Sequence, residues 1–156
     1  MSEQSPTPTH ERVVVGDGER AVAGDHALAR AGARGTAVAG DHARAEAGHG
    51  GRAEAGTLSC ALSGVRGSSV TGERGCSRTG DGGTAITGEW GTSIAGLGGK
   101  VAAGAEGFLV LEARSSSGRR VLLTGAIGED GLRPGVCYEA VDGAFVEADD
   151  QGEVGG

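Results

Sequence analysis

One eight-residue pattern runs through the sequence from residue 13 to residue 108. Each octad begins with a tetrapeptide of the form small-x-small-Gly, and twelve octads follow without a change of register, from VVVG at Val13 to VAAG at Val101. The first, third and seventh positions are mostly small, whereas the second and eighth carry most of the larger and charged side chains. An unbroken period of this kind predicts a repeat architecture in which each unit stacks on the next.

Each octad has the pattern of a short strand followed by a tight turn. Small and larger side chains alternate over five residues, which is the period of a β-strand with one buried face. The next three residues include turn formers such as Asp17-Gly18, and the fourth glycine suits either a positive φ or a close approach of two backbones. AVAGDHAL at Ala21 is repeated as AVAGDHAR at Ala37. This second period of sixteen predicts coils in which residue i stacks on residue i+16.

These periods predict an all-β fold, a flat two-faced β-solenoid (β-helix) of about six 16-residue coils with a small C-terminal β cap. At about 4.8 Å between paired strands, the solenoid is roughly 29 Å long. The chain has 33 glycines and only four aromatic residues, too few large side chains for an ordinary core. Inward Ala, Gly and Ser bury little apolar area, so backbone ladders and close dispersion contacts must supply the stability.

The segments outside the octads are expected to differ in character. Residues 1–12 are polar, and we expect a disordered arm there. Residues 109–148 have ordinary strand patterns, including a hairpin about Asp142, and we expect them to cap the solenoid. Residues 149–156 are expected to form a frayed tail. The N-terminal end has no comparable cap.

Charge and composition limit the classes of function. The net charge is −7, and no basic stripe interleaved with aromatic residues is present, which argues against nucleic acid as a partner. No run of 18 apolar residues exists, so we expect no membrane association. The first twelve residues lack the apolar stretch of a signal peptide, so we expect a cytoplasmic protein with reduced thiols.

The octads resemble known bacterial repeats. GTSIAG at Gly91 and GSSVTG at Gly67 are similar to the octapeptide arrays of bacterial ice nucleation proteins. From Val13 to Ala148 the chain also resembles uncharacterised β-solenoid proteins of bacteria and phages, which carry Gly-Asp-x-Ser/Gly-x-Ala repeats and a small C-terminal strand domain. The resemblance implies a bacterial or phage β-solenoid. For the ice nucleation family it also implies outward Thr-x-Thr rows, which these octads lack.

Our leading hypothesis is a non-enzymatic structural or assembly protein that forms homo-oligomers. Two surfaces suit self-association, a narrow aliphatic row on one face and the uncapped N-terminal edge, because exposed strand edges and apolar patches promote pairing. The candidate interface residues are Val22, Val38, Val70, Ile86, Val13, Val14 and Val15. For the row, simple β-propensity at exposed strand centres is the competing explanation.

Two other functions are considered. The first is a protein-binding module in which the acidic cap recognises a partner through Tyr138, Asp142 and Phe145, with the solenoid as a spacer. The second is an ice-binding protein that uses the aliphatic face, although Arg52 and Glu54 interrupt its regularity. No nucleophile elbow, Walker loop or dinucleotide fingerprint occurs, so we expect neither enzymatic activity nor a cofactor.

Polar side chains are expected to stack along one turn edge, where their types are those of metal ligands. Asp25-His26 and Asp41-His42 should lie one coil apart, and carboxylate and imidazole are competent metal ligands. Neighbouring turn residues usually splay apart, however, and the next coil offers no further ligand. We interpret these residues as solvated turns and assign no metal site.

The period of sixteen also predicts two side-chain contacts. Arg74 should stack over Trp90 in a cation–π contact. Cys60 and Cys76 should be outward neighbours on one sheet, with side chains that point in parallel rather than toward each other. Cys137 is expected to be a core thiol of the cap.

Overall fold

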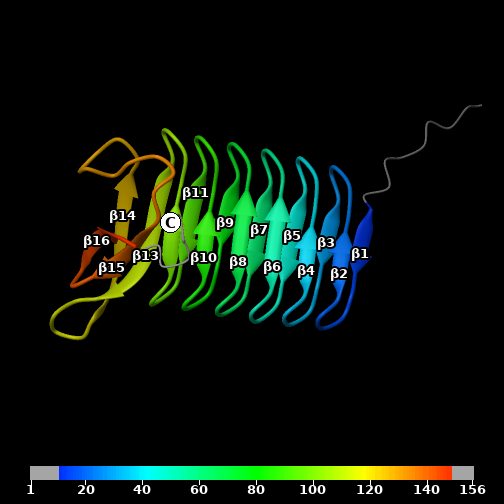
Figure 1. Cartoon of the computed structure of the whole chain (residues 1–156), viewed down its shortest axis with the longest axis horizontal. Coiled ribbons are helices and arrows are strands. Elements are labelled where there is room, and N and C mark those ends of the chain that lie inside the picture. The colour runs from blue at the N-terminus through cyan, green and yellow to red at the C-terminus, as the bar shows by residue number, and fades with distance from the viewer. Residues whose placement is uncertain (1–10, 149–156) are drawn as a thin grey trace, which may run out of the picture.

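The computed structural model describes residues 11–148, which form two β-sheets wound into a β-solenoid with strands closing its C-terminal end (Figure 1). None of these residues belongs to a helix long and apolar enough to cross a lipid bilayer. Residues 1–10 of the expected arm and the whole expected tail, 149–156, lie outside the described residues.

The two faces of the solenoid are two eight-stranded sheets. Sheet A contains, from the N-terminal end, β1 (Arg12–Val14), β3 (Leu28–Arg30), β5 (Arg44–Ala47), β7 (Cys60–Ser63), β9 (Cys76–Arg78), β11 (Thr92–Ala95), β13 (Phe108–Arg114) and β14 (Arg120–Ala126). Sheet B contains β2 (Arg20–Val22), β4 (Thr36–Val38), β6 (Arg52–Ala55), β8 (Ser68–Thr71), β10 (Thr84–Ile86), β12 (Lys100–Ala102), β15 (Tyr138–Val141) and β16 (Ala144–Glu147). The repeat strands are parallel, and β14, β15 and β16 join antiparallel.

The register between coils is sixteen residues throughout the repeat. Ala21 pairs with Ala37 in sheet B, and Cys60 pairs with Cys76 in sheet A. The predicted two-faced β-solenoid of about six coils is therefore confirmed. The parallel ladder also continues beyond residue 108, because Leu111 of β13 pairs with Ala95 of β11. The first half of β13 thus acts as a thirteenth repeat strand before the chain turns back.

Each repeat turn holds its sixth residue in the left-handed region. Eight of these residues are not glycine, with φ between 54° and 59°: His26, Arg34, His42, Leu58, Arg66, Arg74, Trp90 and Glu106. The turn around Arg34 is closed by the Gly35 amide, which donates to the Gly32 carbonyl at 3.1 Å. The Arg34 amide donates to the carbonyl of His49 in the next coil at 2.8 Å. The turns therefore extend the ladder from coil to coil, as the strands do.

The glycine at the fourth position is required by the close stacking of the coils. A Cβ on Gly48 would lie 2.8 Å from the backbone nitrogen of Ala33 and 2.9 Å from the carbonyl carbon of Gly32. The Gly48 amide also donates to the Gly32 carbonyl at 3.1 Å. In the first coil no other turn among residues 11–148 lies beneath this position, and a Cβ on Gly16 would come no closer than 3.5 Å, to Glu19 Oε2. Close approach, and not positive φ, explains the invariant fourth glycine.

Aspartate at the fifth position adds a side-chain rung to the stacked turns. The Asp25 carboxylate accepts a hydrogen bond from the Asp41 amide at 2.8 Å, and the Asp41 carboxylate accepts one from the Thr57 amide at 2.7 Å. The Asp25 oxygen occupies the space that a Cβ on Gly40 would need. The Gly-Asp pair therefore works across two coils, since the glycine of one coil makes room for the aspartate of the coil before it.

The core changes in character along the solenoid. Between residues 21 and 61 its buried apolar side chains are all alanine. In the middle coils hydroxyl groups face inward, where the Ser77 hydroxyl donates to the Ile86 carbonyl at 2.7 Å and lies 3.2 Å from the Thr71 hydroxyl. Toward the cap larger side chains fill the core: Val101, Leu109 and Leu111. The expected thin core of small residues is confirmed for the repeat.

We predict that Gly48→Ala lowers the free energy of unfolding by about 1–3 kcal/mol, because the new methyl group overpacks against rigid backbone. Gly16→Ala is the matched control at the same octad position in the first coil, and we expect a change within about 0.5 kcal/mol. Chemical denaturation followed by circular dichroism measures both. Equal losses in the two variants would show that coil stacking is not the reason for the glycine.

A second pair of variants tests the hydroxyl groups of the core. The buried Ser69 hydroxyl has no hydrogen-bond partner within the described part of the chain, and its register neighbours are Ala53 and Ala85. Removing an unpaired buried hydroxyl should raise the free energy of unfolding, so we expect Ser69→Ala to stabilise by about 1 kcal/mol. Ser77→Ala removes a paired hydroxyl, and we expect a loss of similar size. A loss of stability in Ser69→Ala would contradict this account.

Candidate functional site

The N-terminal end of the solenoid is an open edge formed by β1 and β2. The Leu28 amide donates a hydrogen bond to the Glu11 carbonyl at 2.9 Å. Every second residue of this segment, counted from Glu11, therefore directs its main-chain groups toward the next coil. In a parallel ladder the residues between them direct their N–H and C=O groups to the opposite side. The main-chain groups of Arg12 and Val14 therefore point away from the solenoid. No strand lies beyond them among residues 11–148.

The second sheet ends in the same way. The Thr36 amide donates to the Glu19 carbonyl at 2.9 Å, which leaves the main-chain groups of Arg20 and Val22 directed outward from the edge of β2. Both sheets thus end on unpaired strands at the same end of the molecule.

The valines of the first coil divide between an outer face and the core. The side chains of Val14 and Val22 are each 54% exposed. Val13 and Val15 instead face inward and pack, partly buried, on the alanine core. Of the three consecutive valines, Val14 alone therefore belongs to an outer face, because alternation along β1 directs its two neighbours inward.

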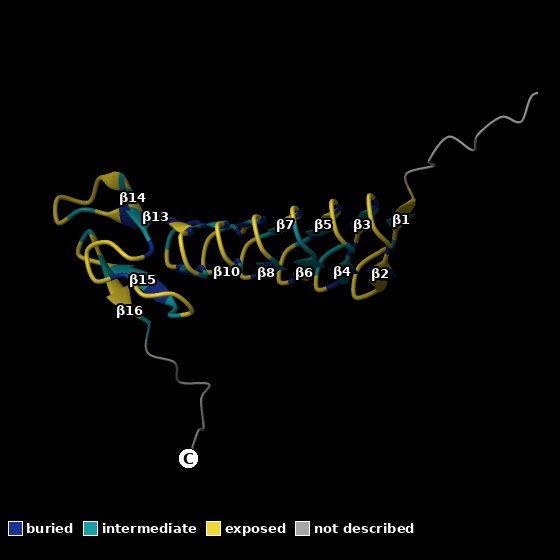
Figure 2. Cartoon of the chain, turned by 90° about the horizontal axis from the view of Figure 1, so that it is seen from above, coloured by how far each residue is buried: buried dark blue, intermediate teal, exposed yellow. Residues whose placement is uncertain are grey.

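The opposite end of the solenoid is closed by the cap. Strand β14 pairs antiparallel with β13, and the β15–β16 hairpin pairs antiparallel with β12. In Figure 2 these strands spread beyond the last coil at the end opposite to β1 and β2. Tyr138, Leu132 and Ile127 join Leu109 and Leu111 in one buried cluster beneath them. The two ends of the solenoid therefore differ: the C-terminal end finishes on the antiparallel strands β14 and β16 around a packed apolar cluster, whereas the N-terminal end finishes on β1 and β2, two short strands of a repeat coil.

Two of the three residues expected to form a partner surface on the cap belong largely to its core. Tyr138 is only 3% exposed, and its hydroxyl accepts a hydrogen bond from the Arg133 amide at 2.7 Å. Phe145 is half-buried and meets Tyr138 edge to face, with 6.4 Å between ring centroids. Asp142 is exposed at the hairpin turn, with φ 51°. The expectation that Tyr138 contacts a partner is thus corrected, because the aromatic pair stabilises the cap.

The cap hairpin is further held by one surface ion pair. The Arg133 guanidinium binds the Glu147 carboxylate, and this contact holds the pKa of Arg133 above its usual value. Both groups are exposed to solvent, so the pair adds little to stability.

The aliphatic row on the outer face of sheet B is present but broken. Val38, Val70 and Ile86 are half-buried by their neighbours along the row. Between Val38 and Val70 stands Glu54, which forms an ion pair with Arg52. The row is therefore split by a charged pair, and the regular flat plane that an ice-binding face requires ends at β6.

At the cap end the row is covered by the loop that precedes β15. The Gly135 amide donates to the Ala103 carbonyl at 2.9 Å, and Ala102 is only 5% exposed. A groove of about 540 Å³ remains between Ile86 and this loop, lined on the far side by Val136 and Cys137. This contact could not be predicted from the sequence, because the loop lies outside the repeat.

The stacked turn of the two histidines is organised by backbone contacts. The rings of His26 and His42 lie parallel, with 5.0 Å between centroids and 4° between planes. The carboxylates of Asp25 and Asp41 accept hydrogen bonds from backbone amides. No group of three or more His, Cys, Asp or Glu side chains within residues 11–148 is arranged to hold a metal ion.

Both side-chain contacts predicted from the period of sixteen are present. The guanidinium carbon of Arg74 lies 5.0 Å from the ring centroid of Trp90. Cys60 and Cys76 are register partners with free thiols, Cys60 exposed and Cys76 half-buried. Burial and the neighbouring Cys60 raise the pKa of the Cys76 thiol. Cys137 is half-buried in the cap.

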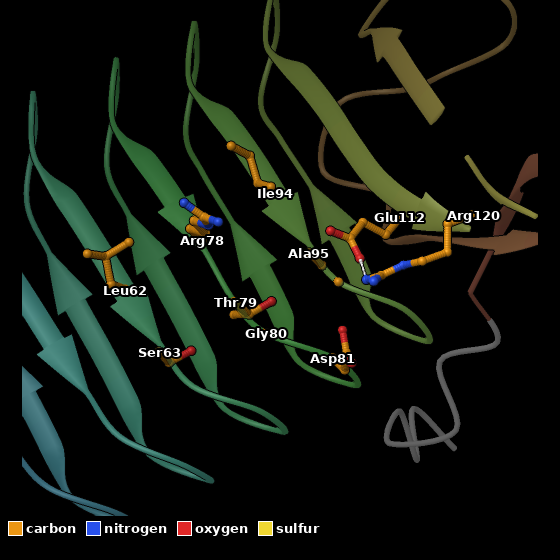
Figure 3. Close-up of a pocket in the computed structure, with 11 residues that line it drawn as sticks. Leu62, Ser63, Arg78, Thr79, Gly80, Asp81, Ile94, Ala95, Glu112 and Arg120 are labelled. Atoms are coloured by element: carbon orange, nitrogen blue, oxygen red, sulfur yellow. Dashed lines mark hydrogen bonds and ion pairs between the residues drawn. The ribbon is translucent and has the colours of Figure 1, made fainter. Parts of the chain in front are cut away.

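A hollow of about 370 Å³ lies on the outer face of sheet A, where the solenoid meets the cap (Figure 3). Four charged side chains line it. Glu112 and Arg120 form an ion pair between β13 and β14, and the Asp81 carboxylate accepts a hydrogen bond from the Leu97 amide at 3.0 Å. Three of the four groups are thus engaged within the protein, and the fourth is Arg78.

No protein-family model, curated protein or solved structure matches this chain. Its function must therefore be inferred from its own surfaces, of which the open N-terminal edge is the most distinctive.

The assignment of Tyr138 to the cap core gives a direct prediction. Tyr138→Phe leaves the Arg133 amide without its acceptor, so we expect the free energy of unfolding to fall by about 1–2 kcal/mol. Asp142→Asn at the exposed turn is the matched control, because asparagine tolerates the same left-handed backbone, and we expect a change within about 0.5 kcal/mol. Thermal and chemical unfolding measure both. An unchanged Tyr138→Phe variant would show that this hydrogen bond contributes nothing to the stability of the cap.

Proposed function

We propose that this protein is a structural rod that forms a head-to-head homodimer through the strand edges of its N-terminal coil. The observation that carries the proposal is the difference between the two ends: the cap end finishes on antiparallel strands, β14 and β16, around a packed apolar cluster, whereas the N-terminal end finishes on β1 and β2, the strands of a regular repeat coil. A regular sheet edge with unpaired N–H and C=O groups is a template for another strand. A second copy of this chain supplies a strand pair of the same shape.

A two-fold axis normal to both sheets allows the two edges to pair together. Rotation about this axis reverses the solenoid and the strand direction, so β1 of one copy lies antiparallel to β1 of the other. The same rotation places β2 antiparallel to β2 of the second copy. An interface of this kind is isologous, and it closes after two copies. The covered C-terminal ends then point away from each other.

The side chains of the first coil are compatible with this pairing. The outward main-chain groups belong to Arg12 and Val14 in β1, so these residues would form the hydrogen-bonded pairs of the antiparallel ladder. Arg12 of one copy then lies opposite Val14 of the other, and the aliphatic stem of the arginine covers the valine. In β2, Arg20 and Val22 make the same combination. Both valines are 54% exposed in the single chain.

Dimerisation would give the molecule a defined length. Six rungs separate β1 from β13 in sheet A, or roughly 29 Å at about 4.8 Å per rung. Two copies joined at their N-terminal edges hold two caps at the ends of a rod about 60 Å long. We infer that this rigid spacing between two identical caps is the contribution of the solenoid.

The proposal is tested by sedimentation velocity on the full chain. We expect the wild-type protein to sediment at twice the chain mass of 15.3 kDa. In Val14→Lys/Val22→Lys each new lysine faces an arginine of the second copy, and like charges directly opposite destabilise a strand pair. We expect this variant to be monomeric. Val14→Pro, which removes an outward N–H without breaking the ladder to β3, should act in the same direction.

The matched control places the same charges on the aliphatic row. Val38→Lys/Val70→Lys should leave the dimer intact if the edge is responsible. A dimer that is lost in this variant and kept in Val14→Lys/Val22→Lys would assign the interface to the row. A wild-type chain that stays monomeric at high concentration would overturn the proposal altogether.

A further inference from the structure

We propose that Cys60 and Cys76 form a two-coordinate site for a soft, thiophilic metal ion of the Cu(I) type on the outer face of sheet A. The two residues are direct register partners in the adjacent strands β7 and β9. Both thiols are free, and both side chains point to the outer face, where Cys60 is exposed and Cys76 half-buried. The site lies away from the N-terminal edge and does not depend on dimerisation.

The strand register favours a metal bridge over a disulfide. In-register parallel strands hold the two Cβ atoms near the strand spacing of about 4.8 Å, with their side chains side by side. A disulfide needs Cβ atoms about 3.5–4.5 Å apart, so the two strands would have to move together. A zinc–thiolate bond is about 2.3 Å long, and an ion with bonds of similar length to both sulfurs spans roughly 4.6 Å. The two thiols already interact, since, besides burial, a hydrogen bond with Cys60 contributes to the raised pKa of Cys76, and a bridging ion would take the place of that contact.

The chemistry of the pair selects the class of ion. Two thiolates without nitrogen or oxygen ligands favour soft ions, of which Cu(I) is the common biological example. Binding is a ligand exchange without change of oxidation state. Two S–H bonds are broken, two Cu–S bonds form, and two protons pass to solvent, which leaves a complex of charge −1.

A nearby cation can balance that charge. Arg78 follows Cys76 by two residues on the same face of β9, and its guanidinium acts electrostatically on the Cys76 thiol. Its neighbours across the ladder are Leu62 and Ile94, so no carboxylate lies directly beside it along the row (Figure 3). Arg44, the register partner of Cys60, is instead engaged by Glu46. We therefore assign the compensating charge to Arg78.

The test is a competition titration of the reduced full chain with Cu(I) and the chromogenic chelator bathocuproine disulfonate, under anaerobic conditions. We expect one Cu(I) per chain. Loss of a residue that supports a metal ligand typically weakens metal binding about 10–100-fold, and loss of a ligand itself should weaken it more. We therefore expect that neither Cys60→Ser nor Cys76→Ser competes with the chelator for Cu(I). Cys137→Ser is the matched control and should bind as the wild type does. Circular dichroism verifies that each variant keeps the solenoid.

The role of Arg78 is tested in the same assay. Arg78→Gln should weaken Cu(I) binding by about tenfold. Arg78→Lys should keep most of the wild-type affinity, because lysine also supplies a positive charge beside the negatively charged complex. The proposal is overturned if the wild type binds no more tightly than Cys60→Ser, or if Cys137→Ser loses binding equally. It is also overturned if one ion bridges two chains, or if oxidised glutathione converts the pair to a disulfide while the reduced chain takes up no Cu(I).

Discussion

Close stacking of backbone on backbone is the constraint on which this structure depends. A Cβ on Gly48 would collide with the turn of the preceding coil, so the fourth octad position must be glycine for the turns to approach and bond. That approach allows the ladder to continue through the turns, as in the hydrogen bond from Arg34 to His49. With alanine, serine and threonine as the core, these continuous ladders must supply much of the stability.

A solenoid built in this way is quasi-one-dimensional, so its two ends carry most of its individuality. Every inner coil is satisfied by its two neighbours, whereas an end coil has only one. At the C-terminal end the octad gives way to larger residues, and Leu109, Leu111 and Tyr138 build a small conventional core. At the N-terminal end β1 and β2 have no further strand beside them among residues 11–148. The self-association that we propose rests on this asymmetry.

The outer faces are free of the constraint that fixes the inside. Residues at the eighth and second positions touch neither the core nor the ladder with their side chains, so their identity can vary without disturbing the fold. The register of sixteen nevertheless places each of them beside a defined partner. Stacked rings at His26 and His42, the contact of Arg74 with Trp90, and the Cys60–Cys76 pair all arise in this way. Regular stacking thus turns a sequence period into side-chain pairs.

The sequence by itself determined the coil length, the inward and outward positions, and the side-chain neighbours at i+16, because one hydrogen-bond register repeats without a slip. The sequence left two explanations for the fourth glycine, a positive φ or a close approach of two backbones. The stacked turns of the structure show that close approach is the reason. Beyond the repeat the sequence predicted the hairpin about Asp142, but only the tertiary structure decided how the cap packs on the solenoid. The burial of Tyr138, the cover over Ala102, and the Glu112–Arg120 ion pair depend on how a non-repeating chain folds back on the last coil. No period relates those residues to their neighbours, so packing alone brings them together.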